Sequence, residues 1–127
     1  MKIYIGHSKE FDYENELYQP IRHSQLNNEH EITLAHEGAT DRVTKDIIRA
    51  SDVMIAEVSF PSTGLGIELA WADSLGCPII CMYCKGSTVS ASLKAVSDTF
   101  IEYADANDMI DKITSELKTK GEYFLPR

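Results

Sequence analysis

The sequence predicts an α/β protein, with a parallel sheet of five strands and helices on both faces. Short apolar runs alternate with helical patterns along all 127 residues, without a repeat, low-complexity stretch or linker. Three of these runs, at residues 3–5, 53–58 and 79–83, have apolar residues on both faces, as central parallel strands covered by helices should. One domain over residues 1–127 is the simplest organisation.

The expected elements follow one another in regular order along the chain. The first strand covers residues 2–6, and the helical region at 13–26 contains Pro20, which either kinks the helix or opens a new one. Further strands are expected at 31–35, 52–58, 78–83 and 99–103. The helices between and after them are expected at 41–50, 66–75, 89–96 and 107–118.

The last of these helices has the clearest pattern in the sequence. Its apolar residues recur at helical spacing and form one stripe, which should pack on the sheet. Lys118, Lys120 and Gly121 are typical of a helix end.

Composition and charge exclude several classes of function. A formal charge of −8 argues against binding long nucleic acid, which needs many basic contacts to phosphates. No apolar run approaches the roughly 18 residues of a membrane span. The chain opens directly on a strand, without the pattern of a secretory signal, so we expect a cytoplasmic protein without a membrane partner.

The three cysteines have no tidy paired spacing, which fits a reducing compartment. Cys81 and Cys84 have opposite parity in one predicted strand and should point to opposite faces of the sheet. We therefore interpret Cys77, Cys81 and Cys84 as structural thiols that share no metal.

The loop after the third strand resembles an anion cradle. Gly64 and Gly66 should let the backbone turn sharply and approach a ligand, while Ser62 and Thr63 offer hydroxyls beside the N–H groups of a helix start. Ligands bind outside the carboxyl ends of strands in such sheets. This loop and the one at residues 6–9 are therefore the expected walls of a site.

Glu68 is the acidic residue of the cradle segment and should fall in the first helical turn. An acid there commonly serves only the helix dipole. Ile67, Leu69 and Trp71 nevertheless suggest a poorly solvated setting, in which a carboxylate can act as a nucleophile or base.

Residues 50–94, and above all the run AEVSFPSTGLGIEL, resemble the 2'-deoxynucleoside 5'-phosphate N-hydrolases, relatives of the nucleoside 2-deoxyribosyltransferases. The resemblance implies a flavodoxin-like (Rossmann-like) three-layer sandwich. In that family the glutamate of the GxGxEL segment attacks the anomeric carbon of deoxyribose, and Glu68 occupies this position. The serine of the PSxGxG segment binds the 5'-phosphate and matches Ser62, whereas the transferases lack it.

The resemblance also assigns roles outside this core segment. Gly6-His7-Ser8-Lys9 lies where the hydrolases carry a Gly-Ser-Ile-Arg loop that completes the phosphate site. Lys9 would replace the arginine as a point charge, and His7 or Ser8 would supply a further contact. Without the family, Lys9 and Glu10 resemble an ordinary solvated pair. Ser90 resembles a serine that the neighbouring subunit contributes, which implies a homodimer with shared sites.

The chain departs from the family at two catalytic positions. The relatives have an aspartate where ungapped counting gives Thr44, and Asp46, two residues on, would take its role if the following turn is shortened. They also have a strand-one tyrosine at the place of Ile3. Tyr4 is adjacent, but alternation along the strand turns it to the opposite face, so we do not predict that it assists catalysis.

The histidines indicate no metal site. His36 follows the second strand and could reach the cleft, while His23 and His30 are expected at the surface. None has a ligand partner at metal-site spacing. We therefore expect a mechanism without metal or cofactor.

The sequence as a whole predicts a hydrolase that cleaves the N-glycosidic bond of 2'-deoxynucleoside 5'-monophosphates. Glu68 would attack C1' and Asp46 would assist departure of the base. Exchange of bases by a deoxyribosyltransferase is the alternative within the class, and a non-catalytic nucleotide-binding or sensing module is the alternative outside it. A third option is action on another N-ribosyl compound, such as a ribonucleotide or NAD. The sequence identifies neither the base nor what rejects a 2'-hydroxyl.

Overall fold

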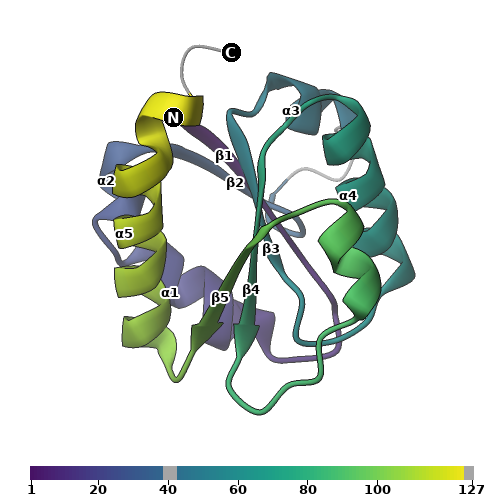
Figure 1. Cartoon of the computed structure of the whole chain (residues 1–127). Coiled ribbons are helices and arrows are strands. Elements are labelled where there is room, and N and C mark those ends of the chain that lie inside the picture. Colours follow the sequence, from purple (N-terminus) through teal and green to yellow (C-terminus); the bar gives the residue numbers. More distant parts are fainter. Residues whose placement is uncertain (39–42, 125–127) are drawn as a thin grey trace.

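The computed structural model describes residues 1–38 and 43–124. Within these residues five parallel strands form one sheet, in the order β2-β1-β3-β4-β5 (Figure 1). The strands are β1 (Lys2–His7), β2 (Glu31–Leu34), β3 (Val53–Glu57), β4 (Ile79–Cys84) and β5 (Thr99–Tyr103). The predicted α/β class is confirmed.

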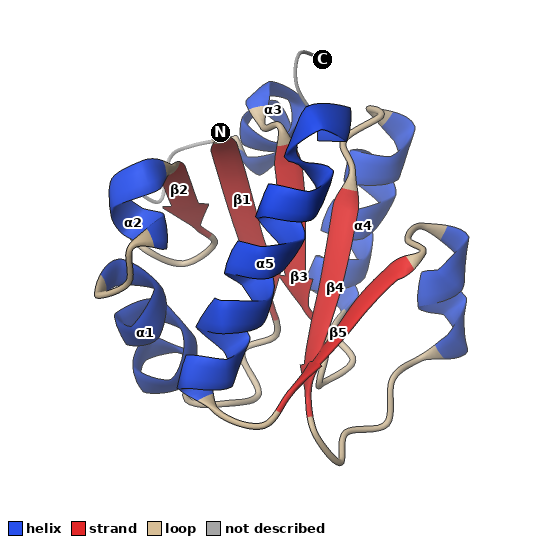
Figure 2. Ribbon diagram, turned by 60° about the vertical axis from the view of Figure 1, so that its left-hand side comes forward, coloured by secondary structure: helices blue, strands red, loops and turns tan. Residues whose placement is uncertain are grey.

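Helices cover both faces of this sheet and complete a flavodoxin-like three-layer sandwich. Figure 2 shows α5 lying across one face of the sheet, with α4 behind it. On the α5 side lie η1 (Glu14–Tyr18), α1 (Gln19–Arg22), α2 (Leu26–Glu29) and α5 (Ala106–Phe124). On the other side lie α3 (Thr44–Ala50), α4 (Thr63–Ser74) and the short 3-10 helix η2 (Ala91–Ala95).

Alternation along each strand divides the core into two clusters. Ile3 and Ile5 of β1 pack in the cluster under α5, whereas Tyr4 packs in the cluster under α4. The same rule separates Cys81, which lies in the α4 cluster, from Cys84, which packs against the α5 cluster. The predicted opposite orientation of these two cysteines is confirmed.

The strand order places a crevice between β1 and β3. The chain runs from β1 outward to β2, then returns across β1 to β3 and continues in the other direction. In the pairing of β1 with β3, His7 lies opposite Glu57, so the two strands end side by side at the carboxyl edge of the sheet. This reversal of chain order is where open α/β sheets bind ligands.

The N-terminal helices match the prediction in part. The helical region expected at 13–26 begins with a π-helix, η1, and the expected alternative in which Pro20 opens a new helix is confirmed, since Pro20 lies in the first turn of α1. Proline is tolerated there because the first N–H groups of a helix have no partner within the helix. The helix expected at 41–50 begins at Thr44, after the extended Val43, and residues 41–42 of the expected range lie outside the described residues.

Three helix boundaries in the second half of the chain also differ. The helix expected at 66 begins at Thr63, because Ser62 adopts an extended conformation and caps it. The element expected at 89–96 is only the 3-10 turn Ala91–Ala95. The expected end of α5 near Gly121 is wrong, since Lys120 pairs with Glu116 one turn earlier and the helix continues to Phe124.

None of the helices in the described ranges combines the length and the apolar character that crossing a membrane requires.

Candidate active site

A cavity of about 550 Å³ opens at the carboxyl edge of the sheet, above β1 and β3. The end of β1 contributes His7 to its wall, the loop after β1 contributes Ser8, Lys9 and Glu10, and the loop after β2 contributes His36. The rest of the described lining is Pro61 to Leu65 at the start of α4, together with Glu68. The two loops singled out from the sequence therefore meet in one cleft, and His36 reaches it as expected.

Glu68 lies in the second turn of α4. Because the helix begins at Thr63, its first turn contains no acidic residue, and the predicted first-turn position of Glu68 is wrong. Interaction with the helix dipole fades beyond the first turn. Interaction with the helix dipole therefore does not explain why a carboxylate occupies this position. The side chain is half-buried at the wall of the cleft.

Tyr4 holds the Glu68 carboxylate. Its hydroxyl donates a hydrogen bond of 2.9 Å to Oε1 of Glu68, and the tyrosine is 1% exposed. The sequence offered no reason to expect Tyr4 at the site, because alternation turns it to the face opposite Ile3, yet the face of Tyr4 is the one that meets Glu68. Ile3 packs under α5, and Tyr4 is the residue that faces α4.

Gly6 allows the same carboxylate to lie against the strand. A Cβ at this position would come within 2.9 Å of Glu68 Oε1 and 3.0 Å of both Leu65 Cδ1 and Met54 Cε. Gly6 was expected to serve the phosphate loop, but its observed contact is with Glu68. Ile67, expected to shield Glu68, is 48% exposed, whereas the carboxylate bonds to the buried Tyr4 and lies close to Gly6.

The cradle is the capped N-terminus of α4. Ser62 Oγ accepts a hydrogen bond of 3.4 Å from the N–H of Leu65, which leaves the hydroxyl proton of Ser62 to be donated elsewhere. Gly64 and Gly66 lie inside the helix with negative φ, so the predicted sharp turn at these residues is wrong. A Cβ at either glycine would meet nothing within 4 Å, and their missing side chains leave this end of the helix open.

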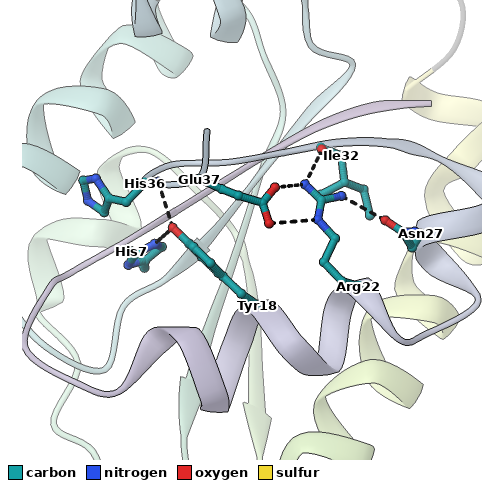
Figure 3. A network of polar contacts seen from close by, with 7 residues as sticks. All are labelled: His7, Tyr18, Arg22, Asn27, Ile32, His36 and Glu37. Carbon is teal, nitrogen blue, oxygen red and sulfur yellow. Dashed lines mark hydrogen bonds and ion pairs between the residues drawn. The ribbon is translucent and has the colours of Figure 1, made fainter. Parts of the chain in front are cut away.

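His7 lines the cleft but is itself buried, and its ring nitrogens bond within the protein. Its Nδ1 donates to the carbonyl of Ser8 at 2.8 Å, because a carbonyl only accepts. Burial lowers the pKa of His7, so the ring is neutral and Nε2 accepts from the Tyr18 hydroxyl at 2.6 Å (Figure 3). Both ring nitrogens of His7 are thus used within the protein.

The other members of this loop remain at the cleft. Ser8 is 1% exposed, and its hydroxyl accepts the N–H of Glu10 at 3.0 Å, so its own proton can point to a ligand. Lys9 is exposed and lines the cleft, where it can serve as a point charge. Ser8 and Lys9 therefore occupy the side of the cavity formed by the β1 loop.

Asp46 and Ser90 lie elsewhere in the single chain. Asp46 is on an exposed face of α3, paired with Arg49, and does not appear in the described lining of the cleft. Ser90 caps η2 and lines a separate hollow of about 410 Å³ with Phe100 and Lys94. A hollow of about 580 Å³ at the opposite edge of the sheet contains neither Glu68 nor the cradle.

The remaining histidines lie away from the cleft. His23 is exposed as expected, whereas His30 is half-buried and contacts the amino group of Met1 at 3.2 Å. Over residues 1–38 and 43–124, no cluster of three or more His, Cys, Asp or Glu side chains has the arrangement of a metal site.

A buried carboxylate beside the cleft loop was missed at the sequence level. Glu57, at the end of β3, accepts hydrogen bonds from the N–H of Ser59 at 2.7 Å, the Ser59 hydroxyl at 2.8 Å and the Tyr103 hydroxyl. Ser59 in turn accepts from the N–H of Cys84 at 2.8 Å. These bonds tie the ends of β3, β4 and β5 together where the cradle loop begins. Burial, followed by the bond to Glu57, strongly raises the pKa of Tyr103.

Tyr103→Phe should therefore destabilise the protein by about 1–3 kcal/mol, because a buried carboxylate loses one of its three donors. Urea unfolding checks this value. Tyr83→Phe, at a half-buried tyrosine of β4 whose hydroxyl bonds to none of the described residues, is the matched control. Equal unfolding free energies for the two variants would contradict the role given to the Tyr103 hydroxyl.

Fold and site together define a flavodoxin-like domain in which a tyrosine-held carboxylate and a helix N-terminus face one cleft. No family model matches the chain. A protein of Methanococcoides burtonii named 2'-deoxynucleoside 5'-phosphate N-hydrolase 1 is 34% identical over 90 residues, which cover 60% of this chain and 74% of that protein. The chain belongs to the 2'-deoxynucleoside 5'-phosphate N-hydrolase family.

Two further relatives match over shorter parts. A protein of the same name from Thermofilum pendens is 33% identical over 76 residues, covering 56% of this chain. The 5-hydroxymethyl-dUMP N-hydrolase of Mus musculus is 42% identical over 53 residues, covering 40% of this chain. These matches span 53% of the Thermofilum protein and 31% of the mouse protein.

Solved structures support the fold. The CMP N-glycosidase BcmB of Clostridium botulinum aligns with a TM-score of 0.64 at 18% identity, over 90% of this chain and 99% of its own. A conserved protein from Enterococcus faecalis aligns with a TM-score of 0.59 at 16% identity, over 92% and 99% of the two chains. The flavodoxin-like architecture is thus shared across domains of similar size.

Proposed function

We propose that this chain hydrolyses the N-glycosidic bond of 2'-deoxynucleoside 5'-monophosphates, with Glu68 as the nucleophile. The observation that carries the proposal is the position of the Glu68 carboxylate, which Tyr4 holds in the same cleft as the capped N-terminus of α4. The names of the curated relatives support this substrate class.

The proposed reaction parallels that of retaining glycosidases. Glu68 attacks C1' of the sugar, the bond from C1' to the base breaks, and a glycosyl ester forms on the carboxylate. Water then attacks C1' and releases deoxyribose 5-phosphate. Tyr4, by donating to Oε1, fixes the direction of the carboxylate before the substrate arrives.

The 5'-phosphate is proposed to bind at the start of α4. The first N–H groups of a helix have no acceptor within the helix and favour an anion. The Ser62 hydroxyl can donate to a phosphate oxygen while it caps the helix, and Ser8 and Lys9 face the cavity from the β1 loop. Binding of this non-reacting group places C1' beside the carboxylate.

Incubation with each deoxynucleoside 5'-monophosphate, followed by chromatography of the free base, tests the proposal. Release of base and deoxyribose 5-phosphate is expected. Cytidine 5'-monophosphate belongs in the same panel, because the structural neighbour BcmB is named for CMP. A new nucleoside formed only when a second base is added would favour base exchange, and tight binding without product would favour a sensing module.

Ser62→Ala should raise KM for a deoxynucleoside monophosphate about 10-fold, and change KM for the unphosphorylated deoxynucleoside little. The reason is that the lost hydroxyl donates to the phosphate. Steady-state kinetics with both substrates separate the two effects. Ser74→Ala, at the exposed end of α4, is the matched control. An equal rise in KM for both substrates would contradict the phosphate contact.

The proposed assembly is a homodimer in which Ser90 of one copy enters the cleft of the other. Ser90 is exposed and separated from the cleft of its own chain, which supports a role across an interface. Sedimentation equilibrium tests the dimer. Loss of activity on dilution below its dissociation constant is the expected sign of a shared site.

A further inference from the structure

Cleavage of the N-glycosidic bond requires a proton for the departing base. Asp46, the acid expected from the sequence, lies on an exposed face and pairs with Arg49. We propose that His36 donates this proton and that Tyr18 and His7 hold His36 in place. This inference rests on the function proposed above.

His36 has the required location. It lies just beyond β2 and lines the same cleft as Glu68, which projects from α4. The two side chains come from different elements that line one cleft, and a glycosidase needs a second group that protonates the leaving group while the nucleophile attacks the sugar. Figure 3 shows the His36 ring directed away from Tyr18.

The chemistry of the lining favours His36 over its neighbours. Histidine is the side chain that ordinarily exchanges a proton near neutral pH, and the described lining contains two, His7 and His36. The nitrogens of His7 are both used, one by the Ser8 carbonyl and one by the Tyr18 hydroxyl. His7 therefore cannot donate to a substrate without breaking a buried contact.

Tyr18 is the positioning residue of this arrangement. Its buried hydroxyl accepts the backbone N–H of His36 at 2.8 Å and donates to Nε2 of His7 at 2.6 Å. The rings of His7 and His36 meet edge to face, with centroids 5.1 Å apart. One hydroxyl thus joins the ends of β1 and β2 at the cleft.

A second clamp holds the residue after His36. Arg22 of α1 forms an ion pair with Glu37 at 2.5 Å and donates to the carbonyl of Ile32 at 3.0 Å (Figure 3). The backbone is therefore held at His36 itself and at the next residue, which restricts where the His36 ring can reach. Catalytic groups act efficiently when their position is fixed in this way.

The proposed step balances in protons and electrons. As the C1'–N bond breaks, its electron pair stays with the base nitrogen system, which takes a proton from the His36 imidazolium, and a Glu68 oxygen forms the ester bond to C1'. In the second half-reaction neutral His36 takes a proton from the attacking water. The C1'–O bond to Glu68 then breaks, and His36 is again protonated.

Comparison of His36→Gln with the unchanged protein on two leaving groups tests this role. On dUMP the kcat of His36→Gln should fall by about 10²-fold or more. On 5-fluoro-dUMP, whose base leaves more readily without a proton, the loss should be at least about 10-fold smaller, because general-acid assistance then contributes less. Tyr18→Phe should show a smaller loss with the same dependence on the leaving group. His23→Gln, on the exposed end of α1, is the control and should leave both rates unchanged.

The pH profile of kcat provides a second readout. In the unchanged protein kcat should fall as pH rises, because a general acid must carry its proton to act, and His36→Gln should lack this limb. Among the residues that the structure describes, the titratable and charged groups on the elements around His36 are His7, Tyr13, Tyr18, Arg22, Lys9, Glu10, Glu37 and Glu68. Because Glu10 is another acid that lines the cleft, the pH profile and both substrates are also measured for Glu10→Gln.

Equal losses on both substrates with an unchanged pH profile would overturn the role of His36. The role of His36 would also be overturned if Glu10→Gln, rather than His36→Gln, lost much more kcat on dUMP than on 5-fluoro-dUMP. An unchanged protein that releases no base from any nucleotide would instead contradict the proposed function. Activity that persists fully in His36→Gln would contradict only this inference.

Discussion

Glu68→Gln is expected to lower kcat for base release from a deoxynucleotide by about 10⁴-fold or more. The amide cannot form the glycosyl ester, whereas its carbonyl can still accept the hydrogen bond that Tyr4 gives to Oε1. The free energy of unfolding should therefore change by less than about 1 kcal/mol. Single-turnover assays of base release, together with urea unfolding, measure both quantities.

The control for this variant is Glu29→Gln, at the exposed end of α2. It removes the same charge from a surface position and should retain full activity. If Glu68→Gln keeps more than a tenth of the kcat, Glu68 is not the nucleophile. If it loses activity but also unfolds, Glu68 has a structural role that Tyr4 and the helix cap do not explain.

Gly6→Ala is expected to lower kcat by about 10²-fold, with a modest loss of stability. The new Cβ would lie 2.9 Å from Glu68 Oε1, so the end of a flexible side chain must move. A displacement of about 1 Å in a catalytic group is enough for a loss of this size. The side chains of Leu65 and Met54, each 3.0 Å from the Cβ, must also shift slightly. Steady-state kinetics and thermal unfolding check the two effects.

A compensating variant isolates the contact with Glu68. Glu68→Asp withdraws the carboxylate by about one methylene, so the Gly6→Ala/Glu68→Asp double variant should lose less activity than the two single losses multiplied together. Strict multiplication of the two losses would show that Gly6 and Glu68 do not interact. An unchanged kcat in Gly6→Ala would show that the close approach has no catalytic value.

The fold could be predicted from the sequence because its central strands are apolar on both faces. All five strands were placed within about one residue at each end, since strand patterns bounded by polar turns are local signals. The helices of the N-terminal region were harder. Pro20 opens α1, which was one of the two expected outcomes, but the π-helical turn before it has no signature in apolar periodicity.

The candidate site was predicted in part. Glu68, Ser62 and the β1 loop do share one cleft. Tyr4 was not expected at the site because the family tyrosine aligns with Ile3, on the opposite face of the strand. The sequence does not show which face of β1 packs against α4, and that packing brings Tyr4 to Glu68. Glu57 carried no signal because its partners, Ser59 and Tyr103, come together through the sheet order. Gly64 and Gly66 were predicted to form a sharp turn, whereas in the structure they are helical and leave space at the N-terminal end of α4.

The central claim is that Glu68 carries the sugar covalently during turnover. Rapid quenching of the reaction with a deoxynucleoside monophosphate, followed by peptide mass spectrometry, tests it most directly. The expected result is a deoxyribose 5-phosphate adduct on the α4 peptide at Glu68, with the first sugar product in the retained anomeric configuration. An inverted first product, with no adduct at any time point, would contradict the account.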